Sequence, residues 1–159
     1  MPYKSESMIS SDMETTSEIP PIAFEALVLC DDVRFENNGK LLLIGVYSDI
    51  VQVVKLPLQM RSIGLAIKAK VLATGRFPFS VSVADPQGNK LLDASGELNY
   101  EGEPGRTIWF PVVMGPALLT IEGSYDVSIS LGDGPLVHES FLVRKTAVPE
   151  VRVTEKKPN

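Results

Sequence analysis

The feature that most constrains the fold is a pair of apolar runs separated by a short polar stretch, within residues 24–48. The runs cover residues 26–30 and 41–47, and the polar stretch between them contains Glu-Asn-Asn-Gly-Lys. Asparagine and glycine tolerate the positive φ angles of tight turns, so this segment predicts a β-hairpin with Gly39 in its turn. In the first run both alternating faces begin apolar, which predicts a central strand that is covered on both sides at one end.

The hairpin turn also fixes an expected register. If the turn centres near residue 38, Asp32 lies opposite about Ile44. Gly45 interrupts the second apolar run, and a glycine inside a strand indicates a bulge or a close approach of another part of the backbone. We expect these features to specify the pairing rather than to carry chemistry.

Cys30 and Asp31 stand at the end of the first apolar run. Cys30 is expected to be a small buried hydrophobe. Asp31 alternates with apolar neighbours, which places it on an apolar face where a carboxylate needs hydrogen-bond donors. We expect those donors to come from the backbone or from Arg34.

The rest of the chain shows strand patterns at spacings near ten residues. Alternation is cleanest over residues 63–71, and Tyr125 opens another alternating run after a corner, as in immunoglobulin-like sandwiches where a tyrosine hydroxyl bonds back to the backbone. Pro111 indicates an edge position or a bulge, and residues 116–120 show a weak helical turn. We predict an all-β fold, an antiparallel β-sandwich of about eight strands that is immunoglobulin-like or jelly-roll-like, with a closed barrel as the alternative.

The length of 159 residues and the composition, 44% apolar and 22% charged, predict a single globular domain. We expect it to cover residues 23–145, between flexible polar tails over 1–22 and 146–159. The single cysteine leaves no intramolecular disulfide and favours a cytoplasmic protein. No apolar block suits a signal peptide or a membrane helix, and the acidic body of the chain lacks a basic patch, so we expect neither membrane nor nucleic acid as a partner.

Groups that could perform catalysis or hold a cofactor are few. The only histidine is His138, expected on the solvent face of the last strand, and with one cysteine the chain lacks the usual ligands of zinc. No glycine-rich phosphate loop is present. We therefore predict no catalytic, cofactor-binding or metal-binding residues and no enzymatic activity, with a hydrolase that uses Asp31 and Glu97 as the remaining catalytic alternative.

Aromatic residues offer a possible partner or ligand surface at Trp109, Phe110 and Tyr100. A single tryptophan is commonly part of a sandwich core, which we expect to be the case for Trp109. Our first hypothesis is a non-enzymatic protein-interaction or assembly module, whose partner is a second copy or another protein. The alternative is a small-ligand or carbohydrate-binding sandwich that stacks its ligand on Trp109, Tyr100 or Tyr125.

The pattern Ala-Leu-Val-Leu-Cys-Asp-Asp-Val at residues 26–33, followed by Gly-Lys-Leu-Leu-Leu-Ile-Gly-Val-Tyr at 39–47, resembles a family of small bacterial proteins catalogued as a domain of unknown function. The segments Asp-Pro-Gln-Gly at 85–88 and Glu-Gly-Ser-Tyr-Asp-Val at 122–127 are similar to strands of the same family. The resemblance spans roughly residues 23–145. It implies a bacterial origin and a sandwich fold, and it implies no catalytic residues.

Overall fold

The computed structural model describes residues 19–147, which contain no helix. The predicted tails therefore lie almost wholly outside the described residues, except that the first strand already begins at Ile22, one residue before the predicted domain. The strands, in chain order, are β1 (Ile22–Cys30), β2 (Asp32–Phe35), β3 (Leu41–Ile44), β4 (Ile50–Val53), β5 (Leu58–Met60), β6 (Ile63–Val71), β7 (Gly75–Ala84), β8 (Lys90–Tyr100), β9 (Arg106–Met114), β10 (Ala117–Leu119), β11 (Gly123–Leu131) and β12 (Val137–Lys145).

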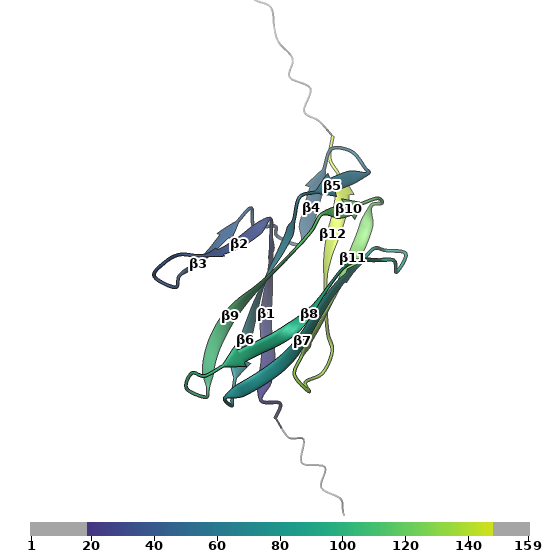
Figure 1. Ribbon diagram of the computed structural model, residues 1–159. Helices are drawn as coiled ribbons and strands as arrows, with labels where there is room; N and C mark the ends of the chain where they lie inside the picture. The colour runs from purple at the N-terminus through teal and green to yellow at the C-terminus, as the bar shows by residue number, and fades with distance from the viewer. Residues whose placement is uncertain (1–18, 148–159) are drawn as a thin grey trace, which may run out of the picture.

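Two sheets pack face to face, as Figure 1 shows. One has the strand order β1-β6-β9, and the other has the order β4-β12-β11-β7-β8. Neighbouring strands are antiparallel except for the short β4, which runs parallel to β12. Both sheets end in edge strands, so the predicted β-sandwich is confirmed and the closed alternative is wrong.

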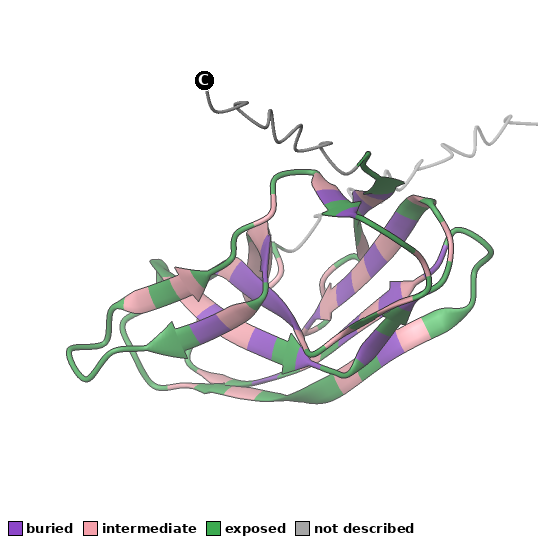
Figure 2. Ribbon diagram, turned by 90° about the horizontal axis from the view of Figure 1, so that it is seen from above, coloured by how far each residue is buried: buried purple, intermediate pink, exposed green. Residues whose placement is uncertain are grey.

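The core lies between the two sheets, and strands such as β11 place a buried residue at every second position (Figure 2). β6 has the predicted bounds, and its alternate residues from Ile63 to Val71 are almost completely buried. Tyr125 in β11 is fully buried, and its hydroxyl donates a hydrogen bond to the carbonyl oxygen of Ile121 at 2.9 Å. The predicted tyrosine corner is therefore present, and the Tyr125 ring stacks on Phe141 with ring centroids 5.3 Å apart.

The predicted first hairpin is shorter than expected. β1 pairs with β6 rather than with β3, and it is an edge strand rather than a central one. The chain changes partner at Asp31, whose backbone N–H donates to the carbonyl oxygens of Ile44 and Gly45. Only β2 and β3 form the hairpin, and in it Asp32 lies opposite Ile44, which confirms the predicted register.

Two further predictions concern the segment around Pro111. That proline lies in β9, an edge strand, as predicted. The helical turn predicted at residues 116–120 is wrong, because β10 forms there and pairs with β5. Ala117 and Leu119 are both fully buried. Burial at every second residue is the pattern of a β-strand and not of a helix.

Candidate functional site

The β2–β3 hairpin projects from the side of the sandwich, and residues 32–44 are called the arm below (Figure 1). Its inward face carries Val33 opposite Leu43, and these side chains pack on a small cluster that contains Cys30 and Ala66. This packing fixes the arm to the outer side of the β1-β6-β9 sheet, and it buries Ala66 on the side of β6 that faces away from the main core.

Cys30 is fully buried beneath the arm, as predicted. Burial raises the pKa of the Cys30 thiol, and the nearby carboxylate of Asp31 acts in the same direction. The thiol therefore stays protonated at neutral pH, and a protonated buried thiol is a poor nucleophile.

The tip of the arm is a tight turn. The N–H of Gly39 donates to the carbonyl oxygen of Glu36 at 2.8 Å, and Gly39 has a φ of +79°. The Asn38 side chain accepts a hydrogen bond from the N–H of Lys40 at 3.0 Å. The turn glycine predicted from the sequence is confirmed, and the tip presents Glu36 and Lys40 to solvent.

The base of the arm is held by Asp31, and here the prediction was partly wrong. The Asp31 carboxylate is exposed, and its hydrogen-bond donor is the Tyr47 hydroxyl rather than the backbone or Arg34. The Asp31 carbonyl oxygen accepts a bond from the Ser62 hydroxyl at 2.8 Å, which ties the arm to the start of β6. The error arises because the chain turns at Asp31, so the strand alternation that placed it on an apolar face ends there.

Gly45 makes the Asp31 position possible. Its φ is +64°, and a Cβ built on it would lie 2.7 Å from Cγ of Asp31. The predicted close approach of another part of the backbone is wrong, because the group that lies against Gly45 is the Asp31 side chain. Gly45 follows the last residue of β3, and because glycine has no side chain the backbone can pass directly against the Asp31 carboxylate.

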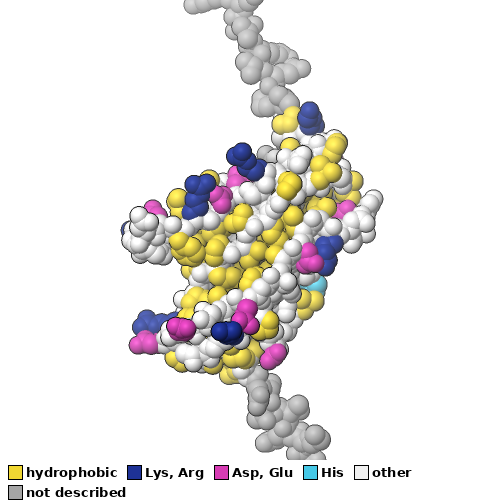
Figure 3. Space-filling model, viewed as in Figure 1, with side chains coloured by type: hydrophobic (Ala, Val, Ile, Leu, Met, Phe, Trp, Pro, Cys, Tyr) yellow, Lys and Arg dark blue, Asp and Glu magenta, His cyan; other side chains and the backbone are white. Residues whose placement is uncertain are grey.

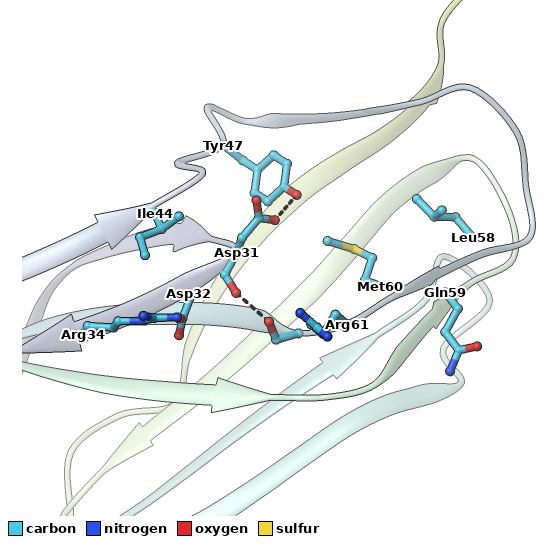
Figure 4. Close-up of a pocket in the computed structure, with 10 residues that line it drawn as sticks. Asp31, Asp32, Arg34, Ile44, Tyr47, Leu58, Gln59, Met60 and Arg61 are labelled. Carbon is cyan, nitrogen blue, oxygen red and sulfur yellow. Dashed lines mark hydrogen bonds and ion pairs between the residues drawn. The ribbon is translucent and has the colours of Figure 1, made fainter.

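A cleft with a volume of about 460 Å³ opens between the base of the arm and residues 58–62 (Figure 4). Its apolar wall consists of Ile44 from the arm with Leu58 and Met60 from β5. Its polar lining consists of Asp31, Asp32, Arg34, Tyr47, Gln59, Arg61 and Ser62.

Some of the charged side chains that line the cleft form an ion pair, and others do not. Nε of Arg34 lies 2.7 Å from Oδ2 of Asp32, and this hydrogen bond lowers the pKa of the Asp32 carboxyl. Burial and the hydrogen bond to Asp31 raise the pKa of Tyr47 to about 12, so the hydroxyl remains a donor at neutral pH. Within residues 19–147, Arg61 makes no ion pair. The same holds for the Asp31 carboxylate, so the cleft contains one positive and one negative charge without an ion-pair partner among these residues.

Large apolar side chains are exposed along the arm and just after it. The exposed fractions are 51% for Phe35, 44% for Leu42, 38% for Ile44 and 56% for Val46. Hydrophobic side chains continue from the base of the arm across the middle of the same side of the molecule (Figure 3). Adjacent exposed apolar residues of this kind are typical of interaction surfaces, whereas single ones are ordinary.

The aromatic residues proposed from the sequence do not meet at one surface. Phe110 is buried in the main core, where its ring centroid lies 5.7 Å from that of Phe79. Trp109 faces the opposite side of β9 and packs half-buried on the cluster around Cys30, so its expected place in the main core is wrong. Tyr100 packs against the main core and donates its hydroxyl to the carbonyl oxygen of Glu103 at 2.7 Å.

His138 lies on the exposed side of β12, close to Ser128 and Asp126. The serine hydroxyl and the aspartate carboxylate both contact the same ring nitrogen, Nδ1, at 3.2 Å. A catalytic triad requires the aspartate and the serine on opposite ring nitrogens. The three residues therefore form a surface hydrogen-bond cluster without the geometry of a nucleophilic site.

The carboxylates of the hydrolase alternative lie apart. Glu97 in β8 forms a surface ion pair with Arg76 at 3.5 Å, and it does not line the cleft that contains Asp31. Within residues 19–147 no three histidine, cysteine, aspartate or glutamate side chains are grouped as metal ligands.

Sequence reasoning missed most of the cleft. Leu42 and Ile44 belong to a run that is apolar on both faces, from which no exposed site is predicted, and the predicted site residues include neither Tyr47 nor Arg61. A signal for the first pair was present, because a strand as short as β3 next to a polar turn has few neighbours to cover it. No local signal could have placed Arg61 in the same cleft as Asp31, since its position depends on where the chain returns after β5.

No helix in the described part of the chain has the length and apolar character needed to cross a membrane. None of the curated proteins compared with this chain matches it.

Several solved structures are similar to the chain at low identity. The alkylpurine DNA glycosylase AlkC of Pseudomonas fluorescens, bound to DNA with an abasic site analog, is 10% identical over 78% of this chain with a TM-score of 0.44. A β-glucosidase of Listeria innocua is 8% identical over 80% of this chain with a TM-score of 0.43. The chain spans only 30% of the glycosylase and 16% of the glucosidase. The C-terminal domain of wzt is 11% identical, with 80% of this chain and 75% of that domain covered and a TM-score of 0.43. At these values the likenesses carry no argument about activity.

A family described as a family of unknown function (DUF6941) has a sequence model that matches residues 25–144. The match begins within β1 and ends within β12, so it includes both sheets, the arm and the cleft. The resemblance inferred from the opening hairpin is confirmed, and the chain belongs to this family of unknown function.

Proposed function

We propose that the protein is a non-enzymatic interaction module that binds a protein partner through the outward face of the arm and the adjoining cleft. The observation that carries this proposal is the exposure of Leu42 and Ile44 on the outward face of the arm and of Val46 just after it. Apolar surface in water costs roughly 25 cal/mol per Å², so burial of these side chains by a partner would stabilise a complex.

The edge of β3 adds a second reason. All four residues of β3 are apolar, and β2 is its only neighbouring strand among the described residues. An exposed apolar edge strand is a template for pairing with another chain, and proteins that do not use such an edge normally protect it with charge, proline or a covering loop. Here the strand itself carries none of these, which favours a partner at this edge.

The carbohydrate-binding alternative has less support. Stacking of a sugar requires an exposed aromatic face, but Tyr125 is fully buried. Trp109 packs on the outer side of β9, whereas Tyr100 packs against the main core, so the two rings form no common platform.

We also propose that the module acts in the bacterial cytoplasm and that its sandwich is immunoglobulin-like. The bacterial setting rests on the family resemblance, and the single buried thiol suits a reducing compartment. The tyrosine corner formed by Tyr125 and Ile121 is a feature of immunoglobulin-like domains.

The test is affinity capture from the source cells with the full chain and two variants. Leu42→Glu places a charge on the arm, and Leu136→Glu is the matched control, because Leu136 is 57% exposed but lies in the turn before β12. We expect proteins held by the unmodified chain to be held equally by Leu136→Glu and reduced about tenfold or more by Leu42→Glu. Identical sets of captured proteins for both variants would contradict the proposal.

A further inference from the structure

The outward face of the arm has an ordered pattern of charge. Asp32 and Arg34 stand on β2, and directly across from them Ile44 and Leu42 stand on β3. Residues two apart in a strand are separated by about 6.6 Å, so the face consists of one acidic, one basic and two apolar positions at the corners of a small rectangle. All four side chains are accessible on this face, with Leu42 and Ile44 among the exposed large hydrophobics.

We propose that this face binds a second copy of the same chain, with two arms stacked antiparallel about a two-fold axis. An axis that lies between the faces and runs across the strands places Asp32 against Arg34 of the second copy, and Ile44 against Leu42. The perpendicular axis in the same plane would place Asp32 against Ile44 and bury a carboxylate on an apolar side chain. The charge pattern therefore selects one arrangement, in which each contact occurs twice as a two-fold interface requires.

The same arrangement brings the tip of each arm to the cleft of the other copy. In an antiparallel stack the tip extends beyond Asp32 and Ile44 of its partner, and this is the end of the arm at which the cleft opens. The tip presents Glu36 and Lys40, and the cleft presents the unpaired Arg61 beside Asp31. The tip of one arm and the cleft of the other therefore lie side by side in the stack, and each carries charges of both signs.

The apolar part of the cleft fits this occupant as well. Leu58 and Met60 form a wall next to Ile44, and in the stack they would cover apolar side chains of the incoming arm. This inference rests on the proposed function, since it assigns the partner of the same face. Beyond the proposed function, it names the partner. The arrangement of charged and apolar side chains on this face is complementary to itself, and this favours a second copy over an unrelated protein.

Sedimentation velocity of the full chain tests the inference through charge reversal. Arg34→Asp places two carboxylates face to face in the stack, and Asp32→Arg places two guanidinium groups face to face. We expect the unmodified chain to form a dimer and each single variant to dimerise at least about tenfold more weakly, because like charges in contact are repulsive. An equimolar mixture of the two variants restores opposite charges at both contacts, so it should form a dimer.

Leu136→Asp is the control for a charge placed elsewhere on the surface, and it should dimerise like the unmodified chain. Circular dichroism checks that each variant keeps its strands. A monomeric unmodified chain at submillimolar concentration, single variants that dimerise like the unmodified chain, or a mixture that stays monomeric would each overturn the inference. A monomer whose captured proteins are still lost in Leu42→Glu would overturn the second copy as the partner and leave the proposed function standing.

Discussion

The close approach of Gly45 to Asp31 predicts a measurable loss of stability on substitution by alanine. At a φ of +64° an L-residue costs about 1 to 2 kcal/mol relative to glycine. The added Cβ would lie 2.7 Å from Cγ of Asp31, so the carboxylate must rotate and give up the hydrogen bond from Tyr47. For a partly exposed bond to a charged group this adds about 1 to 2 kcal/mol, which gives a total of about 2 to 4 kcal/mol.

Gly39→Ala is the matched control, because Gly39 also has a positive φ but a Cβ there would meet nothing within 4 Å. It should cost only about 1 to 2 kcal/mol. Urea denaturation at neutral pH measures both free energies of unfolding. In an Asp31→Ala background the cost of Gly45→Ala should fall to that of Gly39→Ala. Equal costs for the two glycines in the unmodified chain, or an unchanged cost of Gly45→Ala without the carboxylate, would refute the reasoning.

Three other predictions follow from the same contacts. The free energy of unfolding should fall as pH rises from about 10 to 12, because the unfolded chain loses the Tyr47 proton near pH 10 and the folded chain keeps it to about 12. Tyr47→Phe should make that fall smaller in denaturation curves taken across this range, and an equal fall in both proteins would contradict the assignment. Phe110→Ala should lower the free energy of unfolding by about 3 to 5 kcal/mol, and Trp109→Ala should lower it by less, since only Phe110 is in the main core. If calorimetry showed the larger loss for Trp109→Ala, the two side chains would be assigned to the wrong faces of β9. Leu42→Glu should change the unfolding free energy by no more than about 0.5 kcal/mol, and a large loss would mean that Leu42 is buried in the isolated protein.

Much of the sandwich could be predicted because most of its strands have one face in the core and the other face accessible to water. The alternation in β6 and β11 has a period of two, and it identified their core faces correctly. The register of β2 and β3 could also be predicted from local sequence, because it is set by the position of the polar turn at Gly39. Trp109 was misplaced although a signal existed: Phe110 shares its parity with Val112 and Met114, which are buried, so the adjacent tryptophan had to face outward.

The arm could not be predicted because an apolar face does not reveal what covers it. Residues 41–44 are apolar on both faces of the strand, which is typical of a strand buried on both sides. In the structure only one face of β3 packs on the protein itself. The cleft was out of reach for a different reason. Met60 and Arg61 line the cleft opposite the arm, and β5 is held in place by pairing with β10, a segment far away in the chain.

The most direct test of the arm as the binding surface is photo-crosslinking in the cells that produce the protein. A photoreactive amino acid is placed at Leu42 in one variant and at Leu136 in the other, because both positions are exposed and only the first lies on the arm. We expect a discrete crosslinked product from position 42 and none from position 136. No product from position 42, or the same products from both positions, would contradict this expectation.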